Sequence, residues 1–60
     1  MAGYRLYLIS PTPKHIREIV HFAASDDLVA VRRAGDFFDG REMELWEGAR
    51  LVKVFEGGQK

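Results

Sequence analysis

The side chains that could take part in catalysis or bind a metal ion are few and widely spaced. His15 and His21 are the two histidines of the chain. In a strand they would share a face but stand about 20 Å apart, at roughly 3.3 Å per residue. On a helix, a separation of six residues puts them on nearly opposite sides. Because neither geometry brings both to one ion and no metal-ligand motif is present, we expect no metal site and no other cofactor.

The acidic and hydroxyl side chains are explained better by helix capping than by catalysis. Asp26 and Asp27 follow Ser25 where a helix is expected to begin, and short acidic side chains there accept hydrogen bonds from free amides. No hydroxyl lies in a nucleophile-elbow sequence, and no helix follows Gly57-Gly58 to form a phosphate-binding loop. The absence of cysteine removes thiol catalysis, thiolate zinc sites and disulfides. We therefore expect no catalytic residues and no enzyme activity.

Aromatic and basic residues suggest a binding surface instead. On a sheet, Tyr7, Trp46 and Phe55 could stack against the bases of a single-stranded nucleic acid such as RNA. Its contacts would then come from Arg5, Trp46, Arg50 and Lys53. Against this, the chain has no RNP-like motif, its formal net charge is zero, and three glutamates lie in the same hairpin as Trp46. Nucleic-acid binding is therefore the alternative to a protein-binding surface.

The elements that position these residues must fit in one small domain. We assign residues 1–60 to a single domain, with an ordered core over about 4–56 and a frayed tail over 57–60. A chain of this size buries only about 60% of the surface that its unfolded state exposes. Since disulfides and metals are not expected, oligomerisation is the remaining source of stability. The sequence shows no secretory signal and no apolar run of membrane-spanning length, so we expect a cytoplasmic protein.

The first half of the chain contains one clear strand and one ambiguous segment. Residues 4–9 are rich in β-forming residues and end at Ser10-Pro11-Thr12-Pro13, where two prolines favour a turn or an extended link. Residues 14–24 fit either a helix, with Thr12 as N-cap and Pro13 as its first residue, or a strand. The spacing of the apolar residues by itself slightly favours the helix.

The second half predicts a helix followed by a hairpin. A helix beginning at Ser25-Asp26-Asp27 and closing at Asp39-Gly40 would bury a stripe of four side chains: Leu28, Val31, Ala34 and Phe38. Residues 42–46 alternate polar and apolar, Glu47-Gly48 offers a turn, and residues 50–55 are again rich in β-forming residues. This pattern is typical of a β-hairpin.

The segment over residues 39–52 is similar to one found in a family of small uncharacterised proteins common in alphaproteobacteria. The family carries an ELWxGxRxV segment, which residues 44–52 match, and the distinctive block runs from Glu44-Leu45-Trp46 to Arg50. The family also has a YRxY strand like residues 4–7 and an acidic helix start like residues 25–27. The resemblance implies a strand, not a helix, over residues 14–24. It implies no activity, because none is assigned to the family.

The expected fold is therefore α+β: a two-layer ββαββ domain in which a four-stranded, mostly antiparallel sheet carries one helix on one face. The face under the helix would hold Leu6, Leu8, Val20, Phe22, Met43, Leu45, Val52 and Val54. The other face would hold Tyr7, Ile9, Ile19, Trp46, Leu51 and Phe55, beside Arg5, Arg17, His21, Glu42, Glu44 and Lys53. One helix cannot cover both faces, and a large exposed apolar patch marks an interaction surface. We expect a non-enzymatic binding or assembly module that forms a homodimer through this second face or binds another protein partner there.

Overall fold

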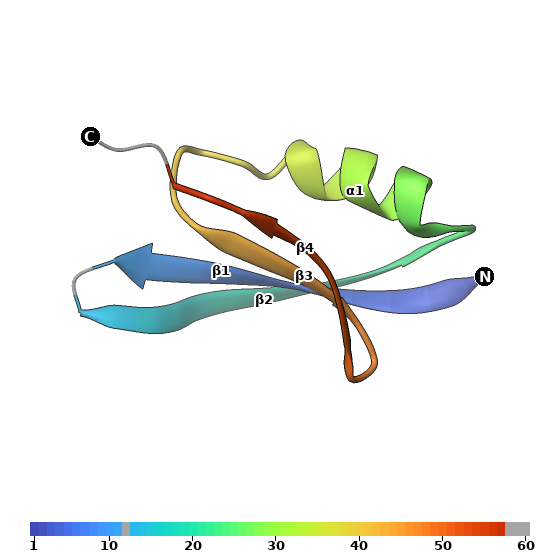
Figure 1. Cartoon of the computed structure of the whole chain (residues 1–60), viewed down its shortest axis with the longest axis horizontal. Coiled ribbons are helices and arrows are strands. Elements are labelled where there is room, and N and C mark those ends of the chain that lie inside the picture. The colour runs from blue at the N-terminus through green and yellow to red at the C-terminus, as the bar shows by residue number, and fades with distance from the viewer. Residues whose placement is uncertain (12, 58–60) are drawn as a thin grey trace.

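The computed structural model describes residues 1–11 and 13–57, and it has the expected ββαββ order (Figure 1). The elements are β1 (Ala2–Pro11), β2 (Lys14–Ala24), α1 (Asp27–Gly35), β3 (Met43–Glu47) and β4 (Arg50–Phe55). The four strands form one antiparallel sheet in the order β2-β1-β3-β4. The two-layer α+β fold is confirmed, with β1 and β3 at the centre of the sheet and β2 and β4 at its edges.

Residues 14–24 form strand β2, so the slight preference for a helix drawn from their spacing was wrong. The strand pairs with β1 over its whole length, from Ala2 opposite Ala24 to Pro11 opposite Lys14. β-branched side chains suit a pleated, half-buried surface, and hydrogen bonding to β1 overrides their helical spacing. Thr12, the N-cap of the alternative helix, lies outside the described residues. Pro13, expected there as the first helical residue, lies in the turn before β2.

Helix α1 begins where the sequence predicts and presents a different face to the sheet. Asp26 is the N-cap, and its carboxylate accepts a hydrogen bond from the Val29 amide at 3.0 Å. The buried residues are Ala30 and Ala34, four apart on one side of the helix. Because alanine side chains are small, the helix backbone can approach the sheet closely. No helix of the residues described here is long and apolar enough to cross a membrane.

Two expectations about this helix were therefore wrong. Of the four residues in the predicted stripe, Ala34 is buried and Val31 is half-buried. Leu28 is 64% exposed, and Phe38 is also exposed. The helix also ends at Gly35, with Asp36 as its C-cap, well before Asp39-Gly40. These last two residues lie instead in the connection to β3, where Gly40 has a φ of +96°.

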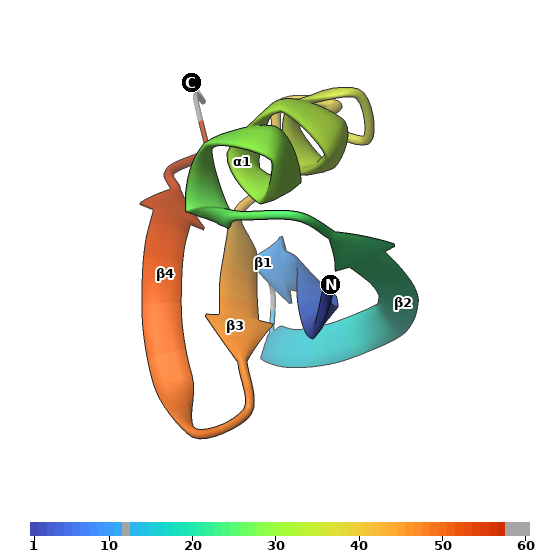
Figure 2. The same ribbon diagram turned by 90° about the vertical axis from the view of Figure 1, so that its right-hand side faces the viewer.

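The core lies between α1 and the face of the sheet that carries Tyr4, Leu6 and Leu8 (Figure 2). The register places Leu45 opposite Leu6 and Met43 opposite Leu8 on this inner face. Leu6, Met43 and Leu45 are the largest side chains that are completely buried. Three small residues complete this core cluster: Ala24 at the end of β2, and Ala30 and Ala34 of α1. The core is thus thin, as expected for a domain of this size.

Asp27 ties the helix to two strands. The Tyr4 hydroxyl donates a 2.8 Å hydrogen bond to its carboxylate, and the Arg50 guanidinium donates two more at 3.0 Å each. Arg50 also donates to Glu47. The Arg50 and Tyr4 hydrogen bonds hold the pKa of Asp27 below its usual value, and the bond to Asp27 raises the pKa of Tyr4 to about 12. Such bidentate, charge-assisted contacts fix orientation as well as position.

Both edge strands contain an irregularity, and each one changes which side chains share a face. In β2 the register shifts opposite Leu8 and Ile9, leaving Arg17 between Glu18 and Ile16 as the extra residue. In β4 the shift lies opposite Leu45 and Trp46, with Val52 between the paired residues. A bulge inserts one residue and reverses the alternation beyond it.

Candidate interaction face

The side of the sheet opposite α1, here called the outer face, is formed by side chains of all four strands. In one row across the sheet His21, Arg5, Trp46 and Leu51 are neighbours, and in the next row the neighbours are Ile19, Tyr7, Glu44 and Val54. Ile9 and Ile16 face each other at the end where the β1–β2 hairpin turns. Among the described residues, the chain has one helix, and Figure 2 shows it over the inner face.

An aromatic pair lies at the centre of this face. The rings of Tyr7 and Trp46 meet edge to face, with centroids 6.5 Å apart and planes at 74°. The Arg5 guanidinium carbon lies 5.7 Å from the Tyr7 ring centroid, and the Trp46 indole donates a 3.1 Å hydrogen bond to Glu44. Arg5 also donates to the carbonyl oxygen of Gly48 at 2.7 Å. These contacts favour one arrangement of both rings, and side chains that are already ordered lose less entropy in an interface than mobile ones.

Around this pair the outer face exposes aliphatic surface. Four large side chains on the edge strands remain accessible: Ile16 at 52%, Ile19 at 46%, Leu51 at 46% and Val54 at 37%. Ile9, in contrast, is already buried, although it lies outside the cluster under the helix. The accessible apolar surface therefore runs from one edge of the sheet to the other, with Tyr7 and Trp46 between the aliphatic groups.

The structure brings together most of the residues expected on this face, but Phe55 is a correction. Tyr7, Ile9, Ile19, Trp46 and Leu51 lie there, as the alternation of the strands predicts. Phe55 pairs with Met43 on the inner face, and its ring centroid lies 6.2 Å from that of Phe38. Val54, expected inside, takes the outer position opposite Glu44. The cause is the β4 bulge, which reverses inside and outside over the end of the strand.

Ile16 and Val54 are the two outer-face residues that sequence reasoning missed. Both lie beyond a bulge in an edge strand. Strict alternation continued through the bulge assigns each of them to the wrong face. No glycine or other residue with special backbone freedom marks either position in the sequence.

The four residues expected to contact nucleic acid do not share a face. Arg5 and Trp46 lie on the outer face, but Arg50 reaches Asp27 of the helix. Lys53 pairs with Leu45, and its ammonium lies 5.5 Å from the Phe55 ring centroid on the inner side. Arg17, also expected on the outer face, forms an ion pair with Asp39 at 3.1 Å, in the connection that follows the helix. The expected basic platform is therefore divided between the two sides of the sheet.

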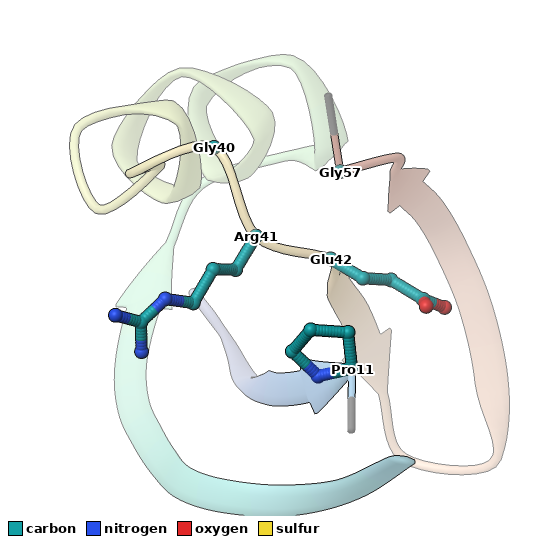
Figure 3. A pocket seen from close by; sticks show the side chains of 5 residues that line it. All are labelled: Pro11, Gly40, Arg41, Glu42 and Gly57. Carbon is teal, nitrogen blue, oxygen red and sulfur yellow. The ribbon is translucent and has the colours of Figure 1, made fainter. Parts of the chain in front are cut away.

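The described residues also form a pocket of about 380 Å³ at the end of the sheet near the β1–β2 turn (Figure 3). It is lined by Pro11, Gly40, Arg41, Glu42 and Gly57. Figure 3 shows the Arg41 and Glu42 side chains pointing away from each other, so their charged groups do not converge on one ligand. A specific small-molecule site needs several polar groups directed at one point, and this pocket lacks that arrangement.

Comparison of the chain with protein-family models, with curated proteins and with solved structures finds no match.

Proposed function

We propose that this chain is a non-enzymatic binding and assembly module that forms a homodimer through its outer face. The observation that carries the proposal is the band of accessible apolar side chains on the face opposite α1, with ordered Tyr7 and Trp46 rings at its centre. Contiguous apolar patches of this kind on small domains mark interaction sites. Aromatic residues at the centre of a patch are the usual anchors of an interface.

The small core supports the same proposal. Among the described residues, three of the eight buried members of the core cluster are alanines, so few large side chains stabilise the isolated domain. A typical stable interface removes about 800 Å² per partner from water. That is about a fifth of the 3901 Å² accessible surface of this chain. Pairing of two outer faces would give each copy a second apolar layer, and the absence of cysteine suits a reducing cytoplasm.

Solution mass measured by light scattering over a range of protein concentrations tests the proposal. We expect a mass near twice 6.9 kDa for the wild-type chain. Trp46→Glu should shift the mass toward that of a monomer, because it places a charge at the centre of the interface. The matched control is Phe37→Glu, since Phe37 is an aromatic residue beyond α1 that is 44% exposed. This control should remain a dimer.

A second variant keeps the test decisive if Trp46→Glu does not fold. Leu51 is 46% exposed on edge strand β4, so Leu51→Glu is expected to weaken the dimer and leave the inner core intact. Circular dichroism checks that each variant is folded. A wild-type chain that remains monomeric up to millimolar concentration overturns the proposal. Retention of a single-stranded RNA oligonucleotide by that monomer, lost on Trp46→Glu, would show that the alternative use of this face is the correct one.

A further inference from the structure

We infer that the two outer faces meet in one specific orientation, in which Arg5 of each subunit pairs with Glu44 of its partner. This inference rests on the proposed self-association and adds the arrangement of the two copies. It is carried by the positions of four side chains at the centre of the outer face: Arg5, Tyr7, Glu44 and Trp46.

These four residues occupy the corners of a rectangle. Arg5 lies directly opposite Trp46, and Tyr7 lies directly opposite Glu44, on neighbouring strands β1 and β3. The charged residues therefore stand at the ends of one diagonal, and the aromatic residues stand at the ends of the other. In an antiparallel pair such diagonal positions are about 7–8 Å apart, so the four side chains form one contiguous group.

Both charges are available for a partner. The ion pairs within residues 1–11 and 13–57 involve other side chains, and neither Arg5 nor Glu44 takes part in one. Arg5 donates to the Gly48 carbonyl oxygen, and Glu44 accepts from the Trp46 indole. Each group thus has a neutral hydrogen-bond partner but no opposite charge. A charge buried in an interface without an opposite charge is strongly unfavourable, so the group that faces each charge in the dimer decides which orientation is favourable.

Symmetry then selects among the ways in which two copies can meet. A two-fold axis parallel to the strands places Arg5 on Trp46 of the partner and Glu44 on Tyr7. An axis across the strands places Arg5 on Tyr7 and Glu44 on Trp46. An axis along the charged diagonal places Arg5 on Arg5 of the partner subunit and Glu44 on Glu44 of the partner subunit, so that like charges repel. The axis along the aromatic diagonal exchanges Arg5 with Glu44, forms two ion pairs and stacks the aromatic side chains between them.

The selected axis also fixes how the two sheets cross. Neighbouring strands are about 4.8 Å apart and successive residues on one face are about 6.8 Å apart along a strand. The diagonal is therefore inclined to the strands, and the strands of the two copies cross at a steep angle of roughly 70–90°. This belongs to the orthogonal class of sheet packing, not to the aligned class at about 30°.

Charge-reversal variants mixed in solution test the orientation. Arg5→Glu alone brings two glutamates together at each former ion pair, and Glu44→Arg alone brings two arginines together. Because like charges that face each other in an interface repel strongly, we expect the Kd of each homodimer to be at least 100-fold higher than that of the wild type. An equal mixture of the two variants restores both ion pairs. We expect it to form a heterodimer within about 10-fold of the wild-type Kd, identified by its mass in native mass spectrometry.

The control is Arg32→Glu, a charge reversal at an exposed position on α1, which should leave the dimer unchanged. If a reversed variant does not fold, Arg5→Gln and Glu44→Gln serve instead, and each should reduce the salt dependence of the wild-type Kd. A wild-type dimer whose two reversed variants also dimerise normally and do not prefer each other overturns this orientation and leaves the proposed function standing. A monomeric wild-type chain overturns the proposed function itself.

Discussion

The position of α1 on the sheet can be tested by comparing two leucines that the sequence pattern treats alike. Leu45 is completely buried at the centre of β3, opposite Leu6, and Leu28 is 64% exposed in the first turn of the helix. The spacing of apolar residues places both in the core. The structure places only Leu45 there, so Leu45→Ala and Leu28→Ala should have very different effects on the free energy of unfolding.

The expected magnitudes follow from burial. Truncation of a fully buried leucine to alanine costs about 2–5 kcal/mol, because a cavity is added to the lost transfer energy. Full burial of a leucine is worth about 1.5–3 kcal/mol, and Leu28 has about a third of its surface buried. Leu28→Ala should therefore cost about 0.5–1 kcal/mol, reduced further by the higher helix propensity of alanine. For a domain of this length, whose total stability is about 3–9 kcal/mol, Leu45→Ala removes much of the folding free energy.

Urea unfolding followed by circular dichroism measures both effects. At a slope of about 1 kcal/mol per molar urea, the midpoint should fall by at least 2 M for Leu45→Ala and by less than 1 M for Leu28→Ala. All samples need the same protein concentration, since association with a second copy also raises the midpoint. A loss of 2 kcal/mol or more on Leu28→Ala would refute the reasoning, because it would mean that the helix is rotated and that Leu28 faces the sheet.

Two further predictions concern β4 and the ion pair that joins it to the helix. Phe55 is half-buried against the inner-face core, so Phe55→Ala should cost about 1.5–2.5 kcal/mol, roughly half the cost of truncating a fully buried phenylalanine. Val54→Ala should cost less than about 1 kcal/mol in the monomer, and equal losses in urea unfolding would contradict the bulged register. Because the pKa of Asp27 is lowered in the folded state, its contribution to stability is present above the ordinary carboxyl pKa and is lost as the pH falls through the folded value. The pKa of Tyr4 is raised to about 12, so its contribution is present below about pH 10 and is lost between there and pH 12. Urea midpoints measured against pH should therefore fall at both ends, with a flatter acid limb in Asp27→Asn and a flatter alkaline limb in Tyr4→Phe; unchanged limbs would show that these groups do not couple to folding.

The sequence predicts the central strands better than the edge strands. Alternation correctly places Leu6 inside and Tyr7 outside in β1, and Leu45 inside and Trp46 outside in β3. These strands have neighbours on both sides, and their paired residues follow one another without interruption between Arg5 and Leu8. Each edge strand contains a bulge that single-sequence alternation does not reveal. The candidate face was accordingly predictable at its centre and wrong at part of its border.

Helix α1 shows a second limit of sequence reasoning. Its N-cap at Asp26 was predictable, because capping depends on a local hydrogen bond to the Val29 amide. Its buried side was not, because the pattern gives weight to large apolar residues. Here the helix residues that are buried in the core are the small Ala30 and Ala34. The preference for a helix over residues 14–24 was wrong for a related reason, since their conformation is decided by hydrogen bonding to the neighbouring strand β1 and not by their own apolar spacing.

The bulges in β2 and β4 also bear on where growth of an assembly would stop. A regular edge strand offers a row of free amides and carbonyls that can bind another strand, and repeated addition of this kind produces fibres. In this sheet both edges are locally bent out of register, at Arg17 and at Val52. Lys14 and Lys53 add charge along the same edges. Both edges are obstructed in this way. If two copies pair once through their outer faces as proposed, a third chain would find no equivalent surface, and assembly would end as a closed pair.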